Sequence, residues 1–273
     1  MATPIGHLGD ISFRAVETLN NVDSIFAEDT RHAKKLLDHY QIKTPSFSLH
    51  EHNESVRVNQ ALEKLAAGQS IAVISDAGTP LISDPGSKLV AQCKQAGCRV
   101  TPIPGACAAI AALSVSGLPT DRFVFEGFLS SKSLAREERL QALATETRTM
   151  IFYESCHRLV ASLDSMRLVF GPERKVVVAR ELTKRFEEVV SGTLEKVVSV
   201  FNSGAAVKGE LVVLVSGAAK SERIPDELTD PEVRLMQSLK DQLSPKTVSA
   251  VGQSVFGRKK KIYYEWLLEN KAE

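Results

Sequence analysis

The chain has 273 residues, more than one typical domain, which favours two α/β lobes with a small appendage over a single core. Hydrophobic residues make up 43% and charged residues 25%, values unlike those of disordered or membrane-embedded chains. The chain has 34 basic and 33 acidic residues, so its net charge is only +1. Overall charge is therefore excluded as a source of nucleic-acid affinity, and any such affinity must come from a local basic patch.

The first half of the chain alternates short β-rich runs with helical patterns. β-rich runs predict strands near 24–27, 70–75 and 99–103. Apolar residues at helical spacing predict helices over 13–19, 55–67 and 87–96. Asp10 or Ser12 can cap the first of these helices. Because strands and helices alternate, we expect a parallel sheet.

The second half starts a new series of elements. A strand near 123–126 is followed by a charged helix over 134–144, which marks the boundary between two lobes. Beyond it we predict one helix, over 157–168, and strands over 149–153, 175–179, 187–191 and 210–215. Two neighbouring strands here can pair antiparallel, so the second sheet is expected to be mixed.

The last fifty residues differ in composition from the rest. Residues 221–232 are acidic and contain two prolines, which is typical of a linker. The segment 245–268 predicts a helix, a turn at Gly257 and a second helix opened by the basic run 258–261. From residue 240 to residue 271, seven basic residues face three acidic ones, which predicts a phosphate-binding tail.

The predicted division of the chain therefore has three parts. Residues 1–120 form an N-terminal α/β lobe with the ligand loops, and residues 121–220 form a second α/β lobe that completes a cleft. Residues 221–273 form a linker and a small basic helical domain. The expected fold class is thus α/β, with two lobes, parallel and mixed sheets with flanking helices, and a helical C-terminal appendage.

Cysteine usage and the first residues bear on location. The four cysteines form no CxxC pair and no framework typical of secreted proteins, so reduced thiols in a cytosolic compartment are expected. The start, MATPIGHLGD, lacks a basic segment followed by an apolar one, which argues against a signal peptide. The apolar stretch 103–118 is rich in Ala, Gly and Ser and favours a packed helix over a membrane span. We predict a cytoplasmic protein with no membrane segment.

The most informative motif is the loop 75–86, SDAGTPLISDPG, which follows the predicted strand IAVI. Turn-forming residues at the carboxyl end of a strand build a ligand crevice in parallel sheets. Gly78 allows backbone to approach a ligand closely, and two prolines stiffen the loop. Asp84 can cap the following helix. An ordinary connection is the alternative, but twelve residues so rich in rigid types exceed the needs of a short crossover.

A second motif, PGACAAIAA, starts at Pro104 and begins a helix of small residues. Amide hydrogens at a helix start can bind a polar ligand edge, and we expect this of residues 106–108, whereas 109–112 are expected to pack on the sheet. The sequence contains no GxGxxG and no GxxxxGK[ST], which disfavours nicotinamide oxidoreductases and P-loop NTPases. His50 and His52 lack a third ligand at metal spacing, so no metal site is predicted.

Eight segments in a fixed order resemble one known family. They are TPIGHLGDIS, AEDTR, HEHNE, SDAGTPLISDPG, PGACAAIAALSVSGLPTDRF, FYESCHR, ARELTKRFEE and KGE. Together they span roughly residues 2–217 and resemble the tetrapyrrole methylase superfamily, specifically the branch that methylates the ribose 2′-hydroxyl of a cytidine in the decoding centre of 16S rRNA. Because eight segments match in order, chance or a merely shared fold is a poor explanation.

The resemblance implies that S-adenosylmethionine lies folded in the cleft between the two lobes, usually in a homodimer. The resemblance and the expected backbone binding by residues 106–108 together imply that both lobes contact the cofactor. The expected cofactor-binding residues are Pro4, Gly6, Ala77, Gly78, Thr79, Ile82, Ala106, Cys107, Ala108, Tyr153, Glu154, Leu182 and Glu210.

Methyl transfer to a hydroxyl needs alignment, desolvation and removal of the hydroxyl proton, and no covalent enzyme intermediate. The sequence does not rank the candidate proton acceptors or orienting groups, because each carboxylate can instead hold an arginine. These candidates are Asp29, Glu54, Asp76 and Glu181. RNA phosphates would meet basic residues around the cleft and in the tail, and these contacts should be salt-sensitive. The basic candidates are Arg31, Arg57, Arg158, Lys184, Arg185, Arg258, Lys259, Lys260 and Lys261.

The predicted partner is 16S rRNA or the 30S subunit, with no DNA and no membrane. One alternative keeps the cofactor but changes the acceptor to a tetrapyrrole-like small molecule or a protein side chain; the basic tail disfavours it. A noncatalytic RNA-binding module is a second alternative, which accounts for the tail but not for the loops. Turnover of S-adenosylmethionine separates this module from an enzyme.

Overall fold

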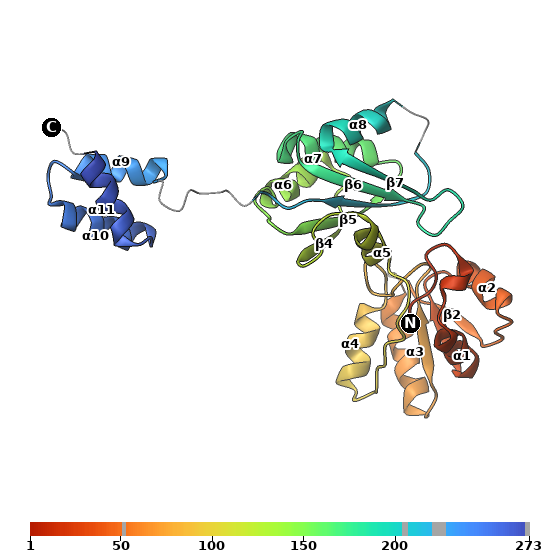
Figure 1. Ribbon diagram of the computed structural model, residues 1–273. Coiled ribbons are helices and arrows are strands. Elements are labelled where there is room, and N and C mark those ends of the chain that lie inside the picture. The colour runs from red at the N-terminus through yellow and green to blue at the C-terminus, as the bar shows by residue number, and fades with distance from the viewer. Residues whose placement is uncertain (51–52, 204–206, 220–227, 271–273) are drawn as a thin grey trace. The chain divides into compact units, whose positions relative to one another are not determined.

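The structure, a computed structural model, describes residues 1–50, 53–203, 207–219 and 228–270 (Figure 1). The chain divides into two compact units, Met1–Ala218 and Ala219–Glu273. The first unit contains two sheets with flanking helices, and the second contains helices only within its described part. The predicted fold class, α/β with parallel and mixed sheets and a helical appendage, is confirmed.

The first sheet is parallel and has the order β2-β1-β3. Its strands are β1 (Ser24–Ala27), β2 (Ser46–Ser48) and β3 (Ile71–Ile74). One face packs on α1 (Phe13–Asn21) and α2 (Thr30–His39), through residues such as Leu19 and Leu37. The other face packs on α3 (Glu54–Ala66) and α4 (Ser87–Gln95). Because helices cover both faces, all four residues of β1 are buried.

The second sheet is mixed and has the order β4-β5-β8-β6-β7. Its strands are β4 (Phe123–Phe128), β5 (Thr149–Ser155), β6 (Lys175–Arg180), β7 (Glu188–Thr193) and β8 (Glu210–Val215). Only the β4–β5 pair is parallel, whereas β5–β8, β8–β6 and β6–β7 are antiparallel. The predicted mixed sheet with an antiparallel pair is therefore confirmed.

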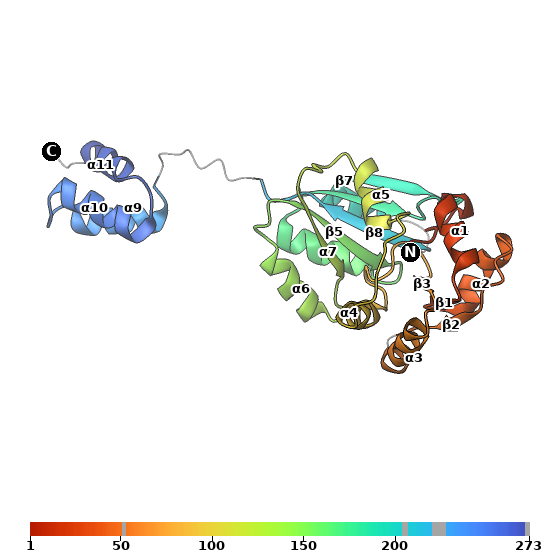
Figure 2. The same cartoon turned by 90° about the horizontal axis from the view of Figure 1, so that it is seen from below.

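Helices cover this second sheet on both sides (Figures 1 and 2). One face packs on α5 (Ala108–Val115). The opposite face packs on α6 (Ser133–Ala142), α7 (Leu159–Phe170) and α8 (Leu194–Asn202). Along β8, Leu211 and Val213 belong to the second of these cores and Val212 and Leu214 to the first, as the two-residue period of a strand requires.

The apolar stretch 103–118 forms a short packed helix. Only eight of its residues are helical, and Ala109, Ala112 and Leu113 are buried against the sheet. Across the described ranges, no helix combines the length and apolar character that crossing a bilayer requires.

The C-terminal unit contains α9 (Asp230–Leu239), α10 (Pro245–Phe256) and α11 (Lys260–Glu269). Met236, Val248, Tyr263 and Leu267 form its core. Helix α9 begins with a capping box in which Thr229 and Glu232 satisfy each other's backbone amides. This small core is completed by a buried carboxylate rather than by apolar groups alone, because Glu232 is only 2% exposed.

Several local predictions were wrong. Residues 99–103 form no strand, because the only backbone hydrogen bond described for them runs from the Ala2 N–H to the Ile103 carbonyl (3.2 Å). The predicted linker 221–232 overlaps α9, and its residues 221–227 lie outside the described ranges. Arg258 and Lys259 precede α11 instead of opening it. Helices α2, α8 and α9 and strand β2 were not predicted.

The start of α4 was also predicted incorrectly. Asp84 makes no cap there, because the N-cap position is Gly86 and has no side-chain cap. The carboxylate of Glu54, which is buried at the start of α3, accepts the amide hydrogens of Lys88 (3.0 Å) and Leu89 (3.4 Å). A neighbouring helix therefore supplies the negative charge that a helix N-terminus favours.

Candidate active site

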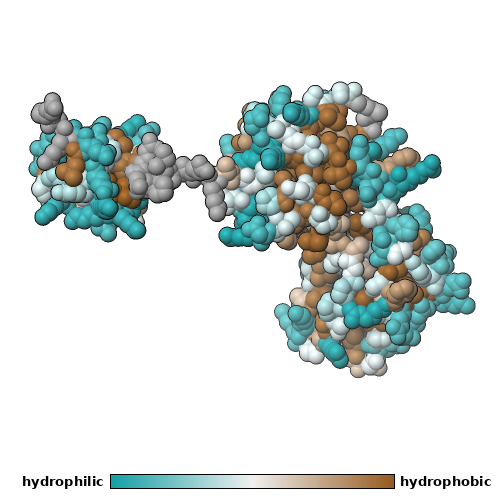
Figure 3. Space-filling model, in the orientation of Figure 1, coloured by the Kyte–Doolittle hydropathy of each residue, from teal (hydrophilic) through white to brown (hydrophobic). Residues whose placement is uncertain are grey.

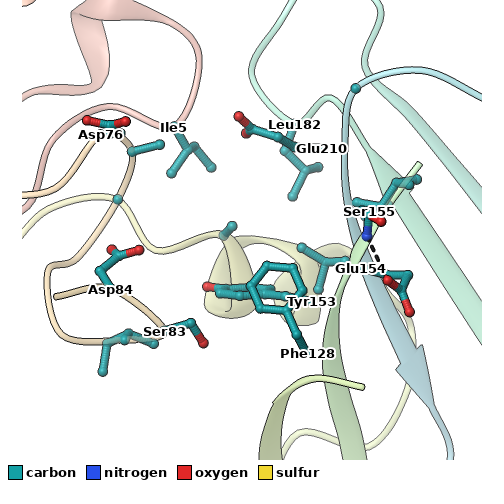
Figure 4. Close-up of a pocket in the computed structure, with 18 of the residues that line it drawn as sticks. Ile5, Asp76, Ser83, Asp84, Phe128, Tyr153, Glu154, Ser155, Leu182 and Glu210 are labelled. Carbon is teal, nitrogen blue, oxygen red and sulfur yellow. Dashed lines mark hydrogen bonds between the residues drawn. The ribbon is translucent and has the colours of Figure 1, made fainter. Parts of the chain in front are cut away.

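A cavity of about 400 Å³ lies between the loop after β3 and the ends of β5, β6 and β8 (Figure 4). All the segments that line it belong to the unit Met1–Ala218. Its wall combines apolar and aromatic side chains with several carboxylates. The lining residues include Ile5, Glu28, Asp76, Ala77, Gly78, Thr79, Ile82, Ser83, Asp84, Ala108, Phe128, Tyr153, Glu154, Ser155, Cys156, Ala179, Leu182, Gly209, Glu210, Leu211 and Val212.

The loop after β3 is held in an unusual backbone conformation. Leu81 and Ser83 have φ of 72° and 67°, in the left-handed region that costs a non-glycine residue about 1–3 kcal/mol. Gly78, at φ 82°, forms a two-bond bridge with Thr3 (2.9 and 3.1 Å). The Thr79 hydroxyl donates to the Ala106 carbonyl at 3.0 Å. These contacts join the N-terminal segment, the loop and the residues before α5 into one rigid wall.

Three carboxylates gather on this wall, from Glu28, Asp76 and Asp84. Asp76 accepts the amide hydrogen of Asp29 (3.0 Å), and Glu28 accepts that of Asp76 (3.3 Å). Burial, with the charges of Glu28 and Asp76, raises the pKa of Asp84 to about 6, although a hydrogen bond with Ser75 opposes this shift. Burial also raises the pKa of Glu28. The wall therefore holds negative charge and has one carboxyl that titrates near neutral pH.

An aromatic surface faces these carboxylates. The centroid of the Tyr153 ring lies 4.9 Å from that of Phe125 and 5.6 Å from that of Phe128, and both pairs are edge to face. Figure 4 shows Tyr153 and Phe128 side by side, with Asp84 across from them. Burial raises the pKa of the Tyr153 phenol, so it stays protonated at neutral pH. The surface suits a flat, apolar ligand group with a hydrogen-bonding edge.

The opposite wall is the connection between β6 and β7 together with the start of β8. Two hydrogen bonds join Glu181 and Glu210. The Glu181 N–H donates to the Glu210 carbonyl (2.9 Å), and the Glu210 N–H donates to the Glu181 carboxylate (3.0 Å). Lys184 pairs with both carboxylates, at 2.8 and 3.1 Å. The Thr183 hydroxyl accepts the amide hydrogen of His7 (3.0 Å), which ties this wall to the N-terminal segment.

The structure brings most of the predicted cofactor-binding residues to this cavity. Those that line it are Ala77, Gly78, Thr79, Ile82, Ala108, Tyr153, Glu154, Leu182 and Glu210. Pro4, Gly6, Ala106 and Cys107 are not in the lining. Pro4 and Gly6 flank the lining residue Ile5, and Cys107 is the N-cap of α5. Glu154 directs its carboxylate to Ser155, Ser162 and Arg158 rather than into the cavity.

Of the candidate proton acceptors, only Asp76 lines the cavity. Asp29 caps α2 and pairs with Arg31, and these hydrogen bonds lower its pKa. Glu54 caps α4, and Glu181 is bound to Lys184 and Glu210. Sequence analysis missed Glu28, Ser83 and Asp84 as lining residues. Asp84 lies in the quoted loop, but it was interpreted as a helix cap.

The predicted RNA-binding cations differ in exposure and in ion pairing. Arg158, Lys184 and Arg258 are directed into ion pairs, with Glu154, Glu181 and Glu232 respectively. Five others are exposed: Arg31, Arg185, Lys259, Lys260 and Lys261. Of these, Arg31 pairs with Asp29 and Lys261 with Glu265. Arg57 is half-buried. For metals, the described part of the chain contains no cluster of three or more His, Cys, Asp or Glu side chains that could hold an ion.

Comparison with known proteins defines the class to which this fold and site belong. Residues 2–198 match the family model described as Tetrapyrrole (Corrin/Porphyrin) Methylases. The solved structure of a cobalt precorrin-4 methyltransferase superposes with a TM-score of 0.61 at 16% identity, covering 79% of this chain and 92% of that one. A uroporphyrin-III C-methyltransferase from Thermus thermophilus, complexed with S-adenyl homocysteine, gives a TM-score of 0.53 at 18% identity and covers 78% and 94%. At such identities these likenesses show the fold.

Two curated relatives are much more similar in sequence. Ribosomal RNA small subunit methyltransferase I of Haemophilus influenzae is 48% identical over 267 residues, or 97% of this chain and 94% of that protein. The protein of the same name from Synechocystis sp. is 55% identical over 223 residues, or 82% and 80%. The chain therefore belongs to the tetrapyrrole methylase family and, within it, to the group that carries this name.

Proposed function

We propose that this chain uses S-adenosylmethionine to methylate 16S rRNA of the small ribosomal subunit, at the ribose 2′-hydroxyl of a cytidine. The name shared by its relatives supports the rRNA substrate. One structural observation supports the chemistry: a single cavity gathers the rigid loop after β3, an aromatic surface and a carboxyl with a raised pKa.

The residues present fit this cofactor. Backbone can approach the ligand closely at Gly78, where φ is 82° and a Cβ would lie 3.3 Å from Ile5. The apolar and aromatic surface around Tyr153 suits a purine ring. The carboxylates of Asp76 and Asp84 lie on the opposite side and complement a positive charge. Bound S-adenosylmethionine supplies an electrophilic methyl group on its sulfonium.

The chain's own task is to align the ribose hydroxyl, exclude water and accept a proton. We assign proton acceptance to Asp84, because its side chain faces the cavity and its pKa of about 6 leaves it ionised yet basic at neutral pH. Burial, together with the charges of Glu28 and Asp76, keeps the carboxyl basic by raising its pKa. The strained loop keeps Asp84 in position while substrate binds.

Gly6 is expected to control the closure of the cofactor site. A Cβ at this position would lie 2.5 Å from Lys184 Cγ, 2.6 Å from Thr183 Oγ1 and 2.9 Å from the Leu182 carbonyl oxygen. Gly6→Val should therefore push the two walls apart, at a cost of about 1–3 kcal/mol, and weaken cofactor binding by roughly tenfold. Calorimetric titration with S-adenosylmethionine measures this. Gly9→Ala, which meets only the His7 ring, is the control; equal affinity of both variants would contradict the expectation.

Three finer points belong to the same proposal. The protein acts in the cytoplasm, where its rRNA substrate is found. The division at residues 120 and 220 separates the two walls of the cavity and the tail. A homodimer is supported by exposed apolar side chains around the second sheet, including Ile110, Val115, Phe123 and Val189. Figure 3 shows apolar side chains gathered over this part of the molecule, and sedimentation velocity tests the dimer.

Mass spectrometry of RNA tests the function directly. The full chain is incubated with 30S subunits and with isolated 16S rRNA in the presence of methyl-labelled S-adenosylmethionine, and the RNA is digested to nucleosides. Labelled 2′-O-methylcytidine is the expected product. Transfer to a base, to a protein side chain or only to small molecules would reject the proposed acceptor, and the absence of transfer to any acceptor would reject the proposed enzyme.

The tail is expected to contribute to RNA affinity. Lys259, Lys260 and Lys261 lie together at the start of α11 and are exposed. Deleting residues 220–273 should weaken RNA binding by about tenfold or more and leave cofactor affinity unchanged. If three phosphate contacts are lost, the slope of log K against log salt falls by roughly 3. Replacing the three lysines with alanine in the full chain should reproduce this change. Equal RNA affinity with and without the tail would contradict the role.

A further inference from the structure

The tip of the connection between β6 and β7 presents an aromatic ring and a cation to solvent. The Glu187 N–H donates to the Lys184 carbonyl at 3.1 Å, so Arg185 and Phe186 occupy the two central positions of this turn. Phe186 is 65% exposed. The Arg185 guanidinium carbon lies 5.5 Å from the centroid of the Phe186 ring.

The base of this turn is fixed on several sides. The Thr183 N–H donates to the Glu187 carboxylate at 2.6 Å, and the Thr183 hydroxyl accepts from His7. Lys184 is held by two carboxylates. Thr183 and Glu181 have φ of 64° and 51°, conformations that persist only where the surroundings determine them. The ring is therefore mounted on a rigid support rather than on a loose loop.

This turn starts at the edge of the cavity. Leu182 lines the cavity, and Glu181 is bonded to Glu210, which also lines it. Only two residues separate Leu182 from Arg185. The exposed tip is therefore close along the chain to the rim of the cavity.

The charges at the tip distinguish Arg185 from its neighbours. Arg180 pairs with Glu188, and Lys184 pairs with Glu181 and Glu210. Within the described ranges, the Arg185 guanidinium makes no ion pair and contacts the Phe186 ring. An exposed guanidinium stacked on an exposed ring suits single-stranded RNA, whose phosphates attract the cation and whose unpaired bases stack on aromatic faces.

We propose that Phe186, supported by Arg185, is the stacking platform for an unpaired RNA base next to the nucleotide that enters the cavity. This inference rests on the proposed function and adds positioning residues for its RNA substrate. Stacking on the tip holds the strand while the target ribose reaches the cofactor. The partner is single-stranded RNA, because a base must be unstacked to reach the ring.

Four variants of the full chain test this platform: Phe186→Ala, Phe186→Trp, Arg185→Ala and, as a matched control, Leu168→Ala. Leu168 is 76% exposed on α7, so its truncation also removes exposed apolar surface. Each variant is assayed with 30S subunits at saturating S-adenosylmethionine, and its affinities for the cofactor and for 16S rRNA are measured separately. Phe186→Ala is expected to weaken RNA binding by about 5- to 100-fold and to raise KM for RNA accordingly.

The remaining readouts separate stacking from a structural role. Phe186→Trp should restore RNA binding, because any large aromatic face stacks, and cofactor affinity should stay unchanged in all four variants. Unchanged RNA binding in Phe186→Ala would overturn the proposal, as would an equal loss of cofactor affinity. A change in sedimentation coefficient would assign the ring to a contact between copies of the chain instead. If the unmodified chain transfers no methyl group to RNA, the proposed function fails; if it does and Phe186→Ala matches it, only the platform fails.

Discussion

Asp84→Asn is expected to slow methyl transfer to RNA by about 10²- to 10⁴-fold, the usual contribution of a positioned proton acceptor. The amide cannot accept the hydroxyl proton, although it keeps the size of the carboxylate. Affinity for S-adenosylmethionine should change only a few-fold, because Asp76 and Glu28 retain negative charge on the same wall. Single-turnover rates and calorimetric titration together measure the two effects.

The pH dependence gives a second test of Asp84. Because burial and neighbouring charges raise the pKa of Asp84 to about 6, the carboxyl is ionised above that pH and protonated below it. The rate of the unmodified chain should therefore fall as pH drops through about 6, whereas the residual rate of Asp84→Asn should lack this step. Asp164→Asn, on the exposed side of α7, is the matched control. Full activity of Asp84→Asn would assign proton acceptance elsewhere.

Glu232→Ala is expected to unfold the C-terminal unit. The carboxylate accepts hydrogen bonds from the Thr229 N–H (2.7 Å) and the Tyr263 hydroxyl (2.7 Å) and pairs with Arg258 (3.1 Å), in a site where Glu232 and Arg258 side chains are 3% and 16% exposed. Removing one partner of a buried ion pair costs about 3–5 kcal/mol. A unit of this size has a free energy of unfolding of a similar magnitude, so little folded population should remain.

Hydrogen exchange of the full chain measures this local unfolding. Peptides from α9 to α11 should lose protection in Glu232→Ala, while those from the second sheet and the cofactor affinity should be unchanged. Asp241→Ala, at an exposed position, is the control. Burial acts to raise the pKa of Glu232, but hydrogen bonds from Thr229 and Tyr263 and the charge of Arg258 outweigh it and lower the pKa to about 2. The stability that ionised Glu232 gives to the C-terminal unit is therefore fully present above pH 4.5 and is lost as the pH falls toward 2.

Elements whose signals are local could be predicted from sequence. Strand β8 and helix α10 were predicted with the bounds that the structure has. A short β-rich run defines the strand, and Pro245 at the first position and Gly257 after the last position define the helix. Strand β2, with three residues, is too short to carry a pattern. The run 99–103 looked like a strand, but a strand also needs a neighbour to pair with, and no local signal shows that.

The candidate site shows the same limit. The loop after β3 was recognised because its glycine, prolines and strand are contiguous. The roles of its carboxyls could not be ranked, since the pKa of Asp84 depends on burial in the folded chain and on the charge of Glu28, which lies far away in the sequence. For the same reason Glu54 and Glu181 looked like acid–base candidates, whereas each satisfies backbone amides of another element.

By itself, the sequence determined the class of fold, the order of most helices and strands, and the loops that surround the cavity, because these depend on residue type and spacing along the chain. Only the tertiary structure decided which charged groups cap helices or form ion pairs and which line the cavity. Burial and hydrogen bonding of a carboxylate depend on atoms that are distant in sequence. The chemistry of Asp84 and the exposed stack of Arg185 on Phe186 therefore became visible only in three dimensions.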